Sequence, residues 1–406
     1  MIIPRPKEVK RISETRKWIL VYGRRKTGKS FLVENFIKYD EYFFVKRDRG
    51  IISKNDEKTI TYETFLALFG RALGDEKTIV VDEFHRLGED FLDFLHAAKK
   101  TGKLILISST LFLSKKMFGK SSPILGLFAE NPIWIIDLRD CISALQKNRL
   151  KKKELVELAI LLREPIAIDY FEESMSPKEM FVKVLGGSVK SIPTLVGEIF
   201  TEEERTLTRI YDAILGAIAD GKVTSGEIST RLFARNLISK NDSSIVQQYL
   251  SNLLELGLIR KIEVYGKNKF TYKHSSPLVR LFYYGDEKYN LSEKPLNPDN
   301  LSELVNVLLP RIVEDEIRGF LALERGLNEA IVEDKDYEVD ACLMRFKKPE
   351  IVVEIKWKEK ISAGDVSDAE RNLSRIDAKE KWLFVPDKHA IKAKTTLKIV
   401  DIFDFM

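Results

Sequence analysis

The chain has 406 residues, of which 44% are hydrophobic and 32% charged, a composition typical of folded globular proteins rather than disordered ones. No apolar run approaches the roughly 20 residues that span a bilayer, and the opening residues lack the apolar core of a secretion signal, so a cytoplasmic protein without a membrane partner is expected. The two cysteines, Cys141 and Cys342, do not suggest a disulfide framework or a zinc cluster, and a net charge of +5 permits a nucleic-acid partner without requiring one.

The first part of the chain alternates strand-like and helix-like patterns. Apolar runs predict strands at 18–23, 42–46, 78–83, 104–109 and 133–137, with helices after Lys29 and at 91–100. Strands that are buried on both faces appear as continuous apolar runs, so residues 1–140 are expected to form a parallel sheet covered by helices. From 141 to 200 the pattern becomes helical, which predicts a helical lid packed beside this sheet.

The second half of the chain predicts two more units. Residues 201–290 show three helical stretches and then two strands around a Gly-Lys-Asn turn, which is the order of a winged helix. Residues 292–300 resemble a linker in their Pro, Asn and Asp content. Residues 300–406 predict a long helix, strands at 337–344 and 350–357, a helix at 362–376 and a strand at 382–385. The fold class is therefore α/β, with several domains.

The strongest motif is GRRKTGKS at residues 23–30, which matches Gly-x-x-x-x-Gly-Lys-[Ser/Thr] between a predicted strand and a predicted helix. Gly23 and Gly28 let the backbone turn so that its amide groups face phosphate. Lys29 places a charge on the β and γ phosphates, and Ser30 offers its hydroxyl to Mg²⁺. The remaining loop residues add charge and backbone amides without assigned contacts: Arg24, Arg25, Lys26 and Thr27. This P-loop predicts binding of ATP or ADP with Mg²⁺.

A second set of polar residues follows two of the predicted strands. The strand TIVVD ends at Asp82, which is expected to hold Mg²⁺, and the next residue, Glu83, is expected to orient the water that attacks the γ-phosphate. The strand LILISS ends at Ser109, a candidate sensor of the γ-phosphate, although hydroxyls that cap a turn explain this run equally well. His85 could report the nucleotide state, but we expect a structural turn histidine.

Acidic and basic residues also gather on the predicted C-terminal strands. Strand alternation places Glu354 and Lys356 on one face, and a hairpin can bring Asp340 beside them, with Glu314 on the preceding helix as a further member. Asp340 and Glu354 could hold Mg²⁺ while Lys356 stabilises the charge that develops in phosphodiester hydrolysis, so all three are candidate catalytic residues. Acid-x-lysine patterns are also common on solvated sheet faces, and both interpretations stay open.

The winged-helix unit offers a candidate DNA contact. Its recognition helix is expected at 243–256, with exposed polar side chains at Ser243, Ser244, Gln247 and Gln248 and with Lys267 and Lys269 in the wing. Because this helix carries no Arg or Lys, a packing module that holds the lid is the alternative.

About the first 200 residues resemble archaeal P-loop ATPases of the AAA+/STAND group. The matching residues are Arg5-Pro6-Lys7-Glu8, which fit the family's Arg-x-x-Glu element, Gly23-Arg24-Arg25, and Asp82-Glu83-Phe84-His85, where the family has Asp-Glu-Phe-Gln. Two family motifs are altered: Ser122–Leu127 lacks the usual arginine, and Gly186-Gly187-Ser188-Val189 stands where the lid has Gly-Gly-x-Pro.

The resemblance implies a winged helix after the lid and a C-terminal nuclease-like domain, and the acid-x-lysine spacing is similar to that of the PD-(D/E)xK restriction-endonuclease-like superfamily. The implied function is a Mg²⁺-dependent ATPase that couples its nucleotide state to DNA binding or processing. The alternative is a STAND-type signalling switch with protein partners and an inactive nuclease-like domain. The domain limits expected on this basis are 1–140, 141–200, 201–290 and 300–406.

Overall fold

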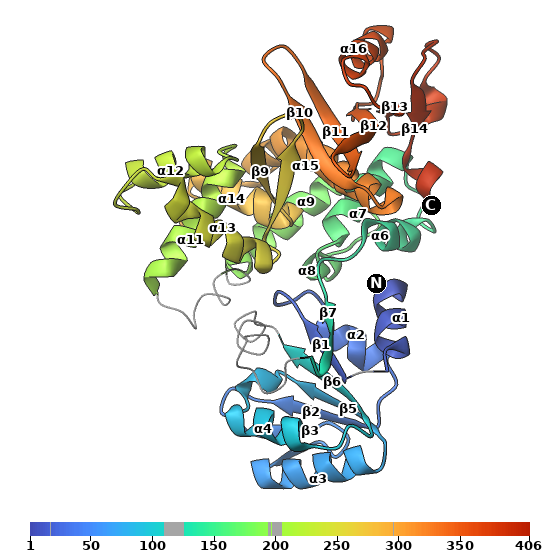
Figure 1. Cartoon of the computed structure of the whole chain (residues 1–406). Helices are drawn as coiled ribbons and strands as arrows, with labels where there is room; N and C mark the ends of the chain where they lie inside the picture. Colours follow the sequence, from blue (N-terminus) through green and yellow to red (C-terminus); the bar gives the residue numbers. More distant parts are fainter. Residues whose placement is uncertain (17, 109–125, 194–195, 197–204, 295) are drawn as a thin grey trace.

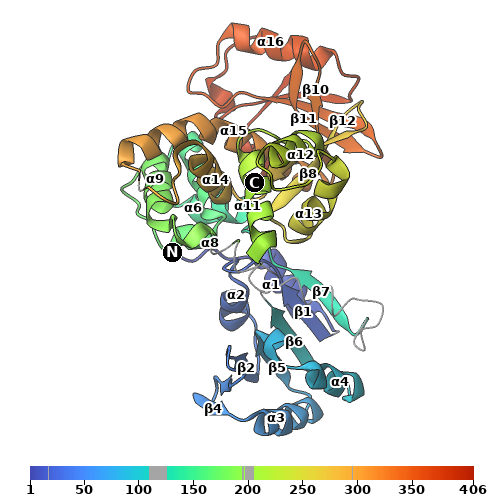
Figure 2. The same ribbon diagram turned by 90° about the vertical axis from the view of Figure 1, so that its left-hand side faces the viewer.

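The computed structural model describes residues 1–16, 18–108, 126–193, 196, 205–294 and 296–406 and divides them into two bodies, each built on a seven-stranded sheet (Figure 1). The first body holds the N-terminal strands, and the second holds the remaining helices and the C-terminal strands. Figure 2, turned by 90°, shows the same division, with the P-loop sheet below the rest of the chain. Every helix in the described part of the chain is too short or too polar to span a bilayer.

The first sheet has the order β4-β3-β2-β5-β6-β1-β7. Its strands are β1 (Trp18–Tyr22), β2 (Glu41–Val45), β3 (Ile51–Ser53), β4 (Lys58–Ile60), β5 (Thr78–Asp82), β6 (Lys103–Ser108) and β7 (Phe128–Pro132). The five strands from β2 to β7 in this order are parallel, and the short β3 and β4 pair antiparallel at the edge. This sheet agrees with the expected P-loop sheet.

Helices cover both faces of the first sheet, as continuous apolar strands require. One face packs against α1 (Pro6–Glu14) and α2 (Lys29–Phe36) through Ile12, Leu32 and Val33. The other face packs against α3 (Tyr62–Gly74) and α4 (Glu89–Ala97), whose aromatic side chains include Phe65 and Phe91. A short 3-10 helix, η1 (Phe84–Arg86), follows β5.

The prediction of a strand at 133–137 is wrong. The last parallel strand is β7, which ends at Pro132, and residues 133–137 form an extended connection to the next helix. Ile133 still donates its amide to the Tyr22 carbonyl at 2.8 Å. Ile133 is buried in the core of the first body and Ile136 in the core of the second, so the run is apolar because it crosses between two cores.

The lid segment contains α6 (Leu138–Leu145), α7 (Lys152–Leu162), α8 (Pro165–Ile168) and α9 (Pro177–Ser188). Their apolar side chains belong to one core with the winged helix and the long α15 (Pro298–Arg325), which differs from the expectation that they pack beside the first sheet. Contact with the first body is made beside the P-loop, where Pro165 of α8 lies against Gly28.

The winged-helix segment contains α11 (Arg205–Ala219), α12 (Ser225–Ala234), α13 (Ser243–Glu255), β8 (Ile259–Val264), β9 (Lys269–His274) and α14 (Pro277–Tyr289). The C-terminal strands are β10 (Asn328–Glu333), β11 (Glu338–Arg345), β12 (Lys348–Ile355), β13 (Glu380–Phe384) and β14 (Lys398–Val400), joined by α16 (Ala363–Ser374) and by the short η2 (Lys388–Ala390), and followed by η3 (Ile402–Phe405).

One sheet joins these two segments. Its order is β14-β13-β12-β11-β10-β8-β9, and β10 pairs parallel with β8 at Ala330↔Glu263 and Ile331↔Val264. The wing of the winged helix therefore continues the C-terminal sheet. Sequence analysis did not identify β10, which is the strand that makes this connection.

Candidate functional site

The P-loop leaves the end of β1 and enters α2, as the motif predicts. Gly23 has φ 145°, and a Cβ atom at this position would lie 2.2 Å from the carbonyl oxygen of Ile133. Gly28 caps α2 with φ 83°, in the left-handed region that glycine adopts readily. Both glycines are therefore required by the backbone path, and the connection at Ile133 fixes one side of the loop.

Lys29 lies inside the loop with its ammonium group bound to backbone oxygens. Its Nζ donates to the carbonyls of Gly23 at 2.9 Å and Arg24 at 2.8 Å. Burial lowers the pKa of Lys29 to about 7, and the charges of Glu83 and Asp82 oppose this shift. A phosphate group near Nζ would replace these weak acceptors with a full negative charge and raise the pKa again.

Asp82, at the end of β5, lies next to the serine of the P-loop. The Ser30 side chain lies close enough to the Asp82 carboxylate to lower its pKa, and the Tyr42 hydroxyl donates to Asp82 Oδ2 at 2.8 Å. The other oxygen, Oδ1, is buried and finds no hydrogen-bond partner in the described part of the chain. Burial raises the pKa of Asp82. A buried carboxylate oxygen without a partner, beside a hydroxyl group, suits Mg²⁺, which prefers oxygen ligands.

Glu83 follows with φ 55°, a conformation that turns the chain from β5 into η1. Its Oε2 atom lies 3.0 Å from Arg86 Nη2 and 3.4 Å from His85 Nε2. Burial lowers the pKa of His85 to about 3, so the imidazole is neutral and its contact with Glu83 is not an ion pair. His85 Nδ1 lies 3.2 Å from the Ser108 hydroxyl at the end of β6. Arg86, which the sequence did not single out, is thus a charged partner of Glu83.

The Ser109 prediction lies outside the described residues, as do Ser122 to Leu125. The side chains of the other predicted loop residues divide between the interior and the surface. Thr27 is buried and donates its hydroxyl to the Arg24 carbonyl at 2.9 Å, whereas Lys26 is exposed and Arg25 half-buried. The charge of Arg25 contributes to lowering the pKa values of Lys29 and His85.

Arg24 forms a buried ion pair with a residue from the lid. Its Nη2 atom donates to both carboxylate oxygens of Glu164, at 2.8 and 2.7 Å. The two side chains are only 3% and 2% exposed. Glu164 lies between α7 and α8, so this pair joins the P-loop directly to the lid helices. Sequence analysis could not find it, because no pattern relates two residues 140 positions apart.

Arg5 holds the other side of the P-loop, which gives a structural role to the Arg-x-x-Glu element. Its guanidinium donates to the Thr27 carbonyl at 2.8 Å and to the Trp134 carbonyl at 2.7 Å. Glu8 lies 3.3 Å from the same guanidinium. The P-loop is therefore tied both to the N-terminal helix and to the connection that leads into the second body.

The second body brings Asp340, Glu354 and Lys356 together, as their predicted hairpin requires. Asp340 Oδ2 accepts the Ile355 amide at 2.8 Å, and Lys356 Nζ donates to Glu354 Oε1 at 2.6 Å. Glu354 Oε2 is buried without a hydrogen-bond partner among the described residues. Burial and the charge of Asp340 raise the pKa of Glu354 to about 7, and burial raises that of Asp340. We call these three residues the acid-lysine cluster.

Two neighbours act on the acid-lysine cluster. Glu314 on α15 has its pKa raised to about 7 by burial and by the charge of Asp340. Asn372 on α16, which the sequence did not single out, lies close enough to Glu354 to lower its pKa. Within the described ranges no group of three or more His, Cys, Asp or Glu residues is arranged to hold a metal ion, so Glu314 does not join the two other acids as a third ligand. The two carboxylates and the unpartnered oxygen of Glu354 still suit a cation that keeps most of its waters, as Mg²⁺ does.

The predicted DNA contacts of the winged helix are exposed on α13 but engaged with β10 in the wing. Ser243, Ser244, Gln247 and Gln248 are exposed on α13. In contrast, both wing lysines contact Glu333 of β10: Lys267 donates to its backbone carbonyl, and Lys269 lies 3.6 Å from its carboxylate. The wing is therefore part of the second sheet at its edge.

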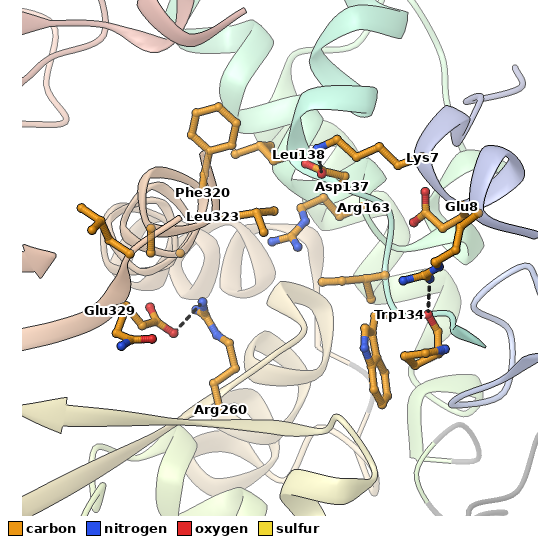
Figure 3. A pocket seen from close by; sticks show the side chains of 17 residues that line it. Lys7, Glu8, Trp134, Asp137, Leu138, Arg163, Arg260, Phe320, Leu323 and Glu329 are labelled. Atoms are coloured by element: carbon orange, nitrogen blue, oxygen red, sulfur yellow. Dashed lines mark hydrogen bonds and ion pairs between the residues drawn. The ribbon is translucent and has the colours of Figure 1, made fainter. Parts of the chain in front are cut away.

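A cavity of about 690 Å³ lies between the two bodies (Figure 3). Its charged lining includes Arg260, which lies 3.4 Å from Glu329, and Lys7, which lies 3.1 Å from Asp137. Leu323 and Trp134 contribute apolar surface. No member of the P-loop motif or of the acid-lysine cluster is among the residues that line this cavity.

Comparison with known proteins identifies the first body. A family model described as an AAA domain matches residues 15–123. No curated protein matches the chain. Residues 15–123 are therefore an AAA domain, and their P-loop is that of an NTPase.

Solved structures resemble the chain weakly. The Aeropyrum pernix ORC2 protein in ADPNP–ADP complexes is 13% identical with a TM-score of 0.38, and the alignment covers 78% of this chain and 95% of that chain. The Aeropyrum pernix ORC1 protein in complex with DNA is 14% identical with a TM-score of 0.32, covering 72% and 95%. Cdc6p from Pyrobaculum aerophilum is 12% identical with a TM-score of 0.29, covering 78% and 97%. Similarity at this level is too low to carry a functional argument.

Proposed function

We propose that this chain is a Mg²⁺-dependent ATPase whose nucleotide state controls the binding or cleavage of nucleic acid, most directly DNA, by its C-terminal body. The observation that carries this proposal is a single helix, α7. It is followed by Glu164, the partner of Arg24 in the P-loop, and from its middle Glu157 binds Trp357, the residue next to Lys356 of the acid-lysine cluster. The helix therefore offers a direct mechanical link between two sites with phosphate chemistry.

In the first body the chain's own residues have separable tasks. Lys29 and the amides of the loop bind the phosphates, and Ser30 and Asp82 hold Mg²⁺, which when bound offsets the charge of the β and γ phosphates. Glu83 orients and polarises the attacking water. Arg86 keeps Glu83 in place through the contact at 3.0 Å, and the neutral His85 fills the space between Glu83 and β6.

In the second body the acid-lysine cluster has the composition that phosphodiester hydrolysis needs. Asp340 and Glu354 would hold Mg²⁺, whose charge when bound polarises a phosphate oxygen. Lys356 donates to Glu354 at 2.6 Å and is close enough to stabilise charge on an adjacent oxygen. The buried, mutually repelling carboxylates are typical of functional sites, because such an arrangement costs stability unless a ligand compensates it.

The link between the two sites consists of contacts on α7. Two residues after its C-terminal end, Glu164 binds Arg24 of the P-loop at 2.7 Å. In its middle, Glu157 accepts the indole N–H of Trp357 at 2.9 Å, and Trp357 is the residue after Lys356. Lys153 on the same helix lies 3.3 Å from Glu359. We infer that a displacement of Glu164 is passed through α7 to Trp357 and to the segment that carries Lys356.

The winged helix supports the coupling by packing rather than by reading DNA. Its wing is paired with β10, both wing lysines contact Glu333, and α13 carries no Arg or Lys. These observations also favour the competing function, a nucleotide-dependent signalling switch of the STAND type that binds protein partners and has an inactive C-terminal site. The two functions differ in whether nucleic acid stimulates ATP hydrolysis and in whether the acid-lysine cluster cleaves it.

The test measures ATP hydrolysis with Mg²⁺, with and without single-stranded and duplex DNA, together with cleavage of the same DNA. Stimulation of hydrolysis by DNA that Glu83→Gln abolishes, and cleavage that Asp340→Asn abolishes, support the proposal. DNA-independent hydrolysis and no cleavage in the wild type favour the signalling switch instead.

The α7 link has its own control. Trp357→Phe removes the indole donor to Glu157 and should reduce the stimulation of ATP hydrolysis by DNA, leaving basal hydrolysis unchanged. Trp382→Phe removes a comparable bond, in which the indole donates to Glu380 at 2.9 Å within the C-terminal sheet. If both variants behave alike, α7 does not carry the coupling.

A further inference from the structure

The turn between β11 and β12 has a shape that its residues do not favour. β11 ends at Arg345 and β12 begins at Lys348, and these two residues pair across the hairpin, so the loop has only Phe346 and Lys347. Phe346 has φ 46° and Lys347 φ 65°. Two-residue turns with positive φ at both positions strongly prefer Asn, Asp and Gly, because a Cβ atom is disfavoured there. We call Arg345–Lys348 the aromatic tip.

The exposure of the aromatic tip is equally unusual. Phe346 is 91% exposed, the highest value among the large hydrophobic side chains of the described residues. It belongs to none of the hydrophobic clusters found in those residues. Phe346 combines a disfavoured backbone conformation with an aromatic ring held in water, and the structure shows no contribution of this ring to folding. Residues with such disfavoured backbone angles are typical of functional positions.

The charge around Phe346 is positive. Its neighbours Arg345, Lys347 and Lys348 are all exposed. Glu350 partly offsets this charge, because it lies 3.5 Å from Arg345 and 2.8 Å from Lys379. Within the described ranges no ion pair is found for Lys347 or Lys348. An aromatic ring between free cations matches a strand of nucleic acid, in which bases can stack on the ring and phosphates flank it.

The position of the aromatic tip relates it to the acid-lysine cluster. Asp340 and Phe346 lie six positions apart on one hairpin, which at the rise of a β-strand is roughly 20 Å. The tip and the acid-lysine cluster lie at opposite ends of β11, and the residues between them, Ala341 to Met344, are buried.

We propose that the aromatic tip is a nucleic-acid contact, in which Phe346 stacks on an unpaired base and Lys347 and Lys348 bind adjacent phosphates. This inference deepens the proposed function and rests on it, since it names a nucleic-acid contact on the hairpin that also carries Asp340. The occupant is a single strand or the unpaired end of a duplex, because stacking needs an exposed base face.

The test measures binding of a fluorescent oligonucleotide, single-stranded or blunt duplex, to the full-length protein by anisotropy, with EDTA present so that no cleavage occurs. Phe346→Ala should weaken binding of the single strand about 5- to 150-fold, the range for loss of one stacked base. Phe346→Trp should preserve it. Leu323→Ala, which removes another exposed apolar side chain, 62% exposed, should have no effect.

The lysines are tested by salt dependence. Lys347→Ala combined with Lys348→Ala should reduce the slope of log affinity against log salt by about 1.4 for a single strand, the value for two lost phosphate contacts. Lys392→Ala combined with Lys394→Ala makes the same charge change at exposed positions elsewhere in the C-terminal segment and should leave the slope unchanged.

The outcomes separate the tip from the proposed function. If the wild type binds the oligonucleotide and Phe346→Ala changes the affinity by less than twofold, the aromatic tip is not the nucleic-acid contact. The ATPase proposal is unaffected by this result. Tip-dependent binding without DNA-stimulated hydrolysis or cleavage supports the tip and counts against the coupling. Binding to vesicles of phosphatidylcholine and phosphatidylserine in equal parts, with none to either oligonucleotide, overturns the tip as a nucleic-acid contact.

Discussion

The buried ion pair between Arg24 and Glu164 makes a quantitative prediction about stability. Replacing Glu164 by alanine removes both acceptors of Arg24 Nη2, which lie at 2.8 and 2.7 Å. The guanidinium then stays in a site where its side chain is 3% exposed, without a charged partner. An uncompensated charge of this kind costs about 3–5 kcal/mol of folding free energy.

The magnitude translates into a thermal shift. The entropy of unfolding is about 2.1 cal/mol/K per residue near 60 °C, which for 406 residues gives about 0.85 kcal/mol/K if the chain unfolds as one unit. A loss of 3–5 kcal/mol then lowers Tm by about 4–6 °C, and by more if the two bodies unfold separately. Glu164→Gln keeps one acceptor oxygen and should lose less.

The assay is thermal unfolding followed by circular dichroism in the absence of nucleotide. The decisive variant is the double change Arg24→Met with Glu164→Leu, which removes both charges and keeps most of the volume. Because the desolvation cost disappears with the charges, the double variant should be more stable than Glu164→Ala alone. The pair does not hold the P-loop to the lid if the Tm shifts of Arg24→Met and Glu164→Leu alone sum to that of the double variant. The same conclusion follows if Glu164→Ala lowers Tm by less than about 1 °C.

Further predictions concern the two sites. Glu83→Gln should reduce ATP hydrolysis by about 10²- to 10⁴-fold while ATP still binds, as steady-state kinetics and calorimetry would show. Burial lowers the pKa of Lys29 to about 7, and a bound phosphate raises it again. ATP binding should therefore take up protons near pH 7–8 and weaken as pH rises through 7. Calorimetry in buffers of different ionisation enthalpy measures this proton uptake, and Lys29→Met should abolish it. Gly23→Ala should destroy nucleotide binding, since its Cβ would lie 2.2 Å from a carbonyl oxygen, whereas Gly88→Ala, with nothing within 4 Å, should leave binding intact. The pKa of Glu354 is raised from 4.5 to about 7, so between these pH values the folded state binds a proton that the unfolded state has lost. The free energy of unfolding should therefore fall as pH rises through this range. Denaturant titrations at pH 5 and pH 8 measure the fall, and Glu354→Gln should lessen it.

The nucleotide site could be predicted closely because its chemistry is local. The P-loop needs two glycines, a lysine and a hydroxyl within eight residues, and the structure places them where β1 ends and α2 begins. Asp82 was predictable for a similar reason, since it ends a buried parallel strand and such ends meet at one edge of the sheet. The roles of these residues in catalysis stay predictions.

The contacts that support the sites could not be predicted, because they join residues far apart in the chain. Glu164 has no motif around it, and its importance follows from Arg24 alone. The strand β10 was missed because its residues, NEAIVE, are partly polar. Its pairing with β8, which joins the two C-terminal segments, depends on tertiary structure. The apolar run at 133–137 wrongly predicted a strand because its side chains are buried. They are buried in two different cores, Ile133 in the first body and Ile136 in the second, and not in a sheet.

The fused sheet limits how a nucleotide signal can travel. Because β8 pairs with β10, the winged helix and the C-terminal strands move as one body, and the lid helices share their core with α15. A switch of the P-loop can therefore act on the acid-lysine cluster in two ways, by turning the whole second body or by moving α7 within it. The cavity of about 690 Å³ between the bodies provides room for the first motion (Figure 3).

The second motion depends on the bond between Glu157 and Trp357. If the second body turned as a rigid unit, removing this bond would leave the coupling between ATP and DNA intact, since every part of the body would move together. If α7 moves within it, the same change would interrupt the coupling and leave both sites intact. The burial of Glu157 and the length of that bond, 2.9 Å, favour a path through α7, because a buried hydrogen bond to a carboxylate resists separation more strongly than the polar contacts that line the cavity.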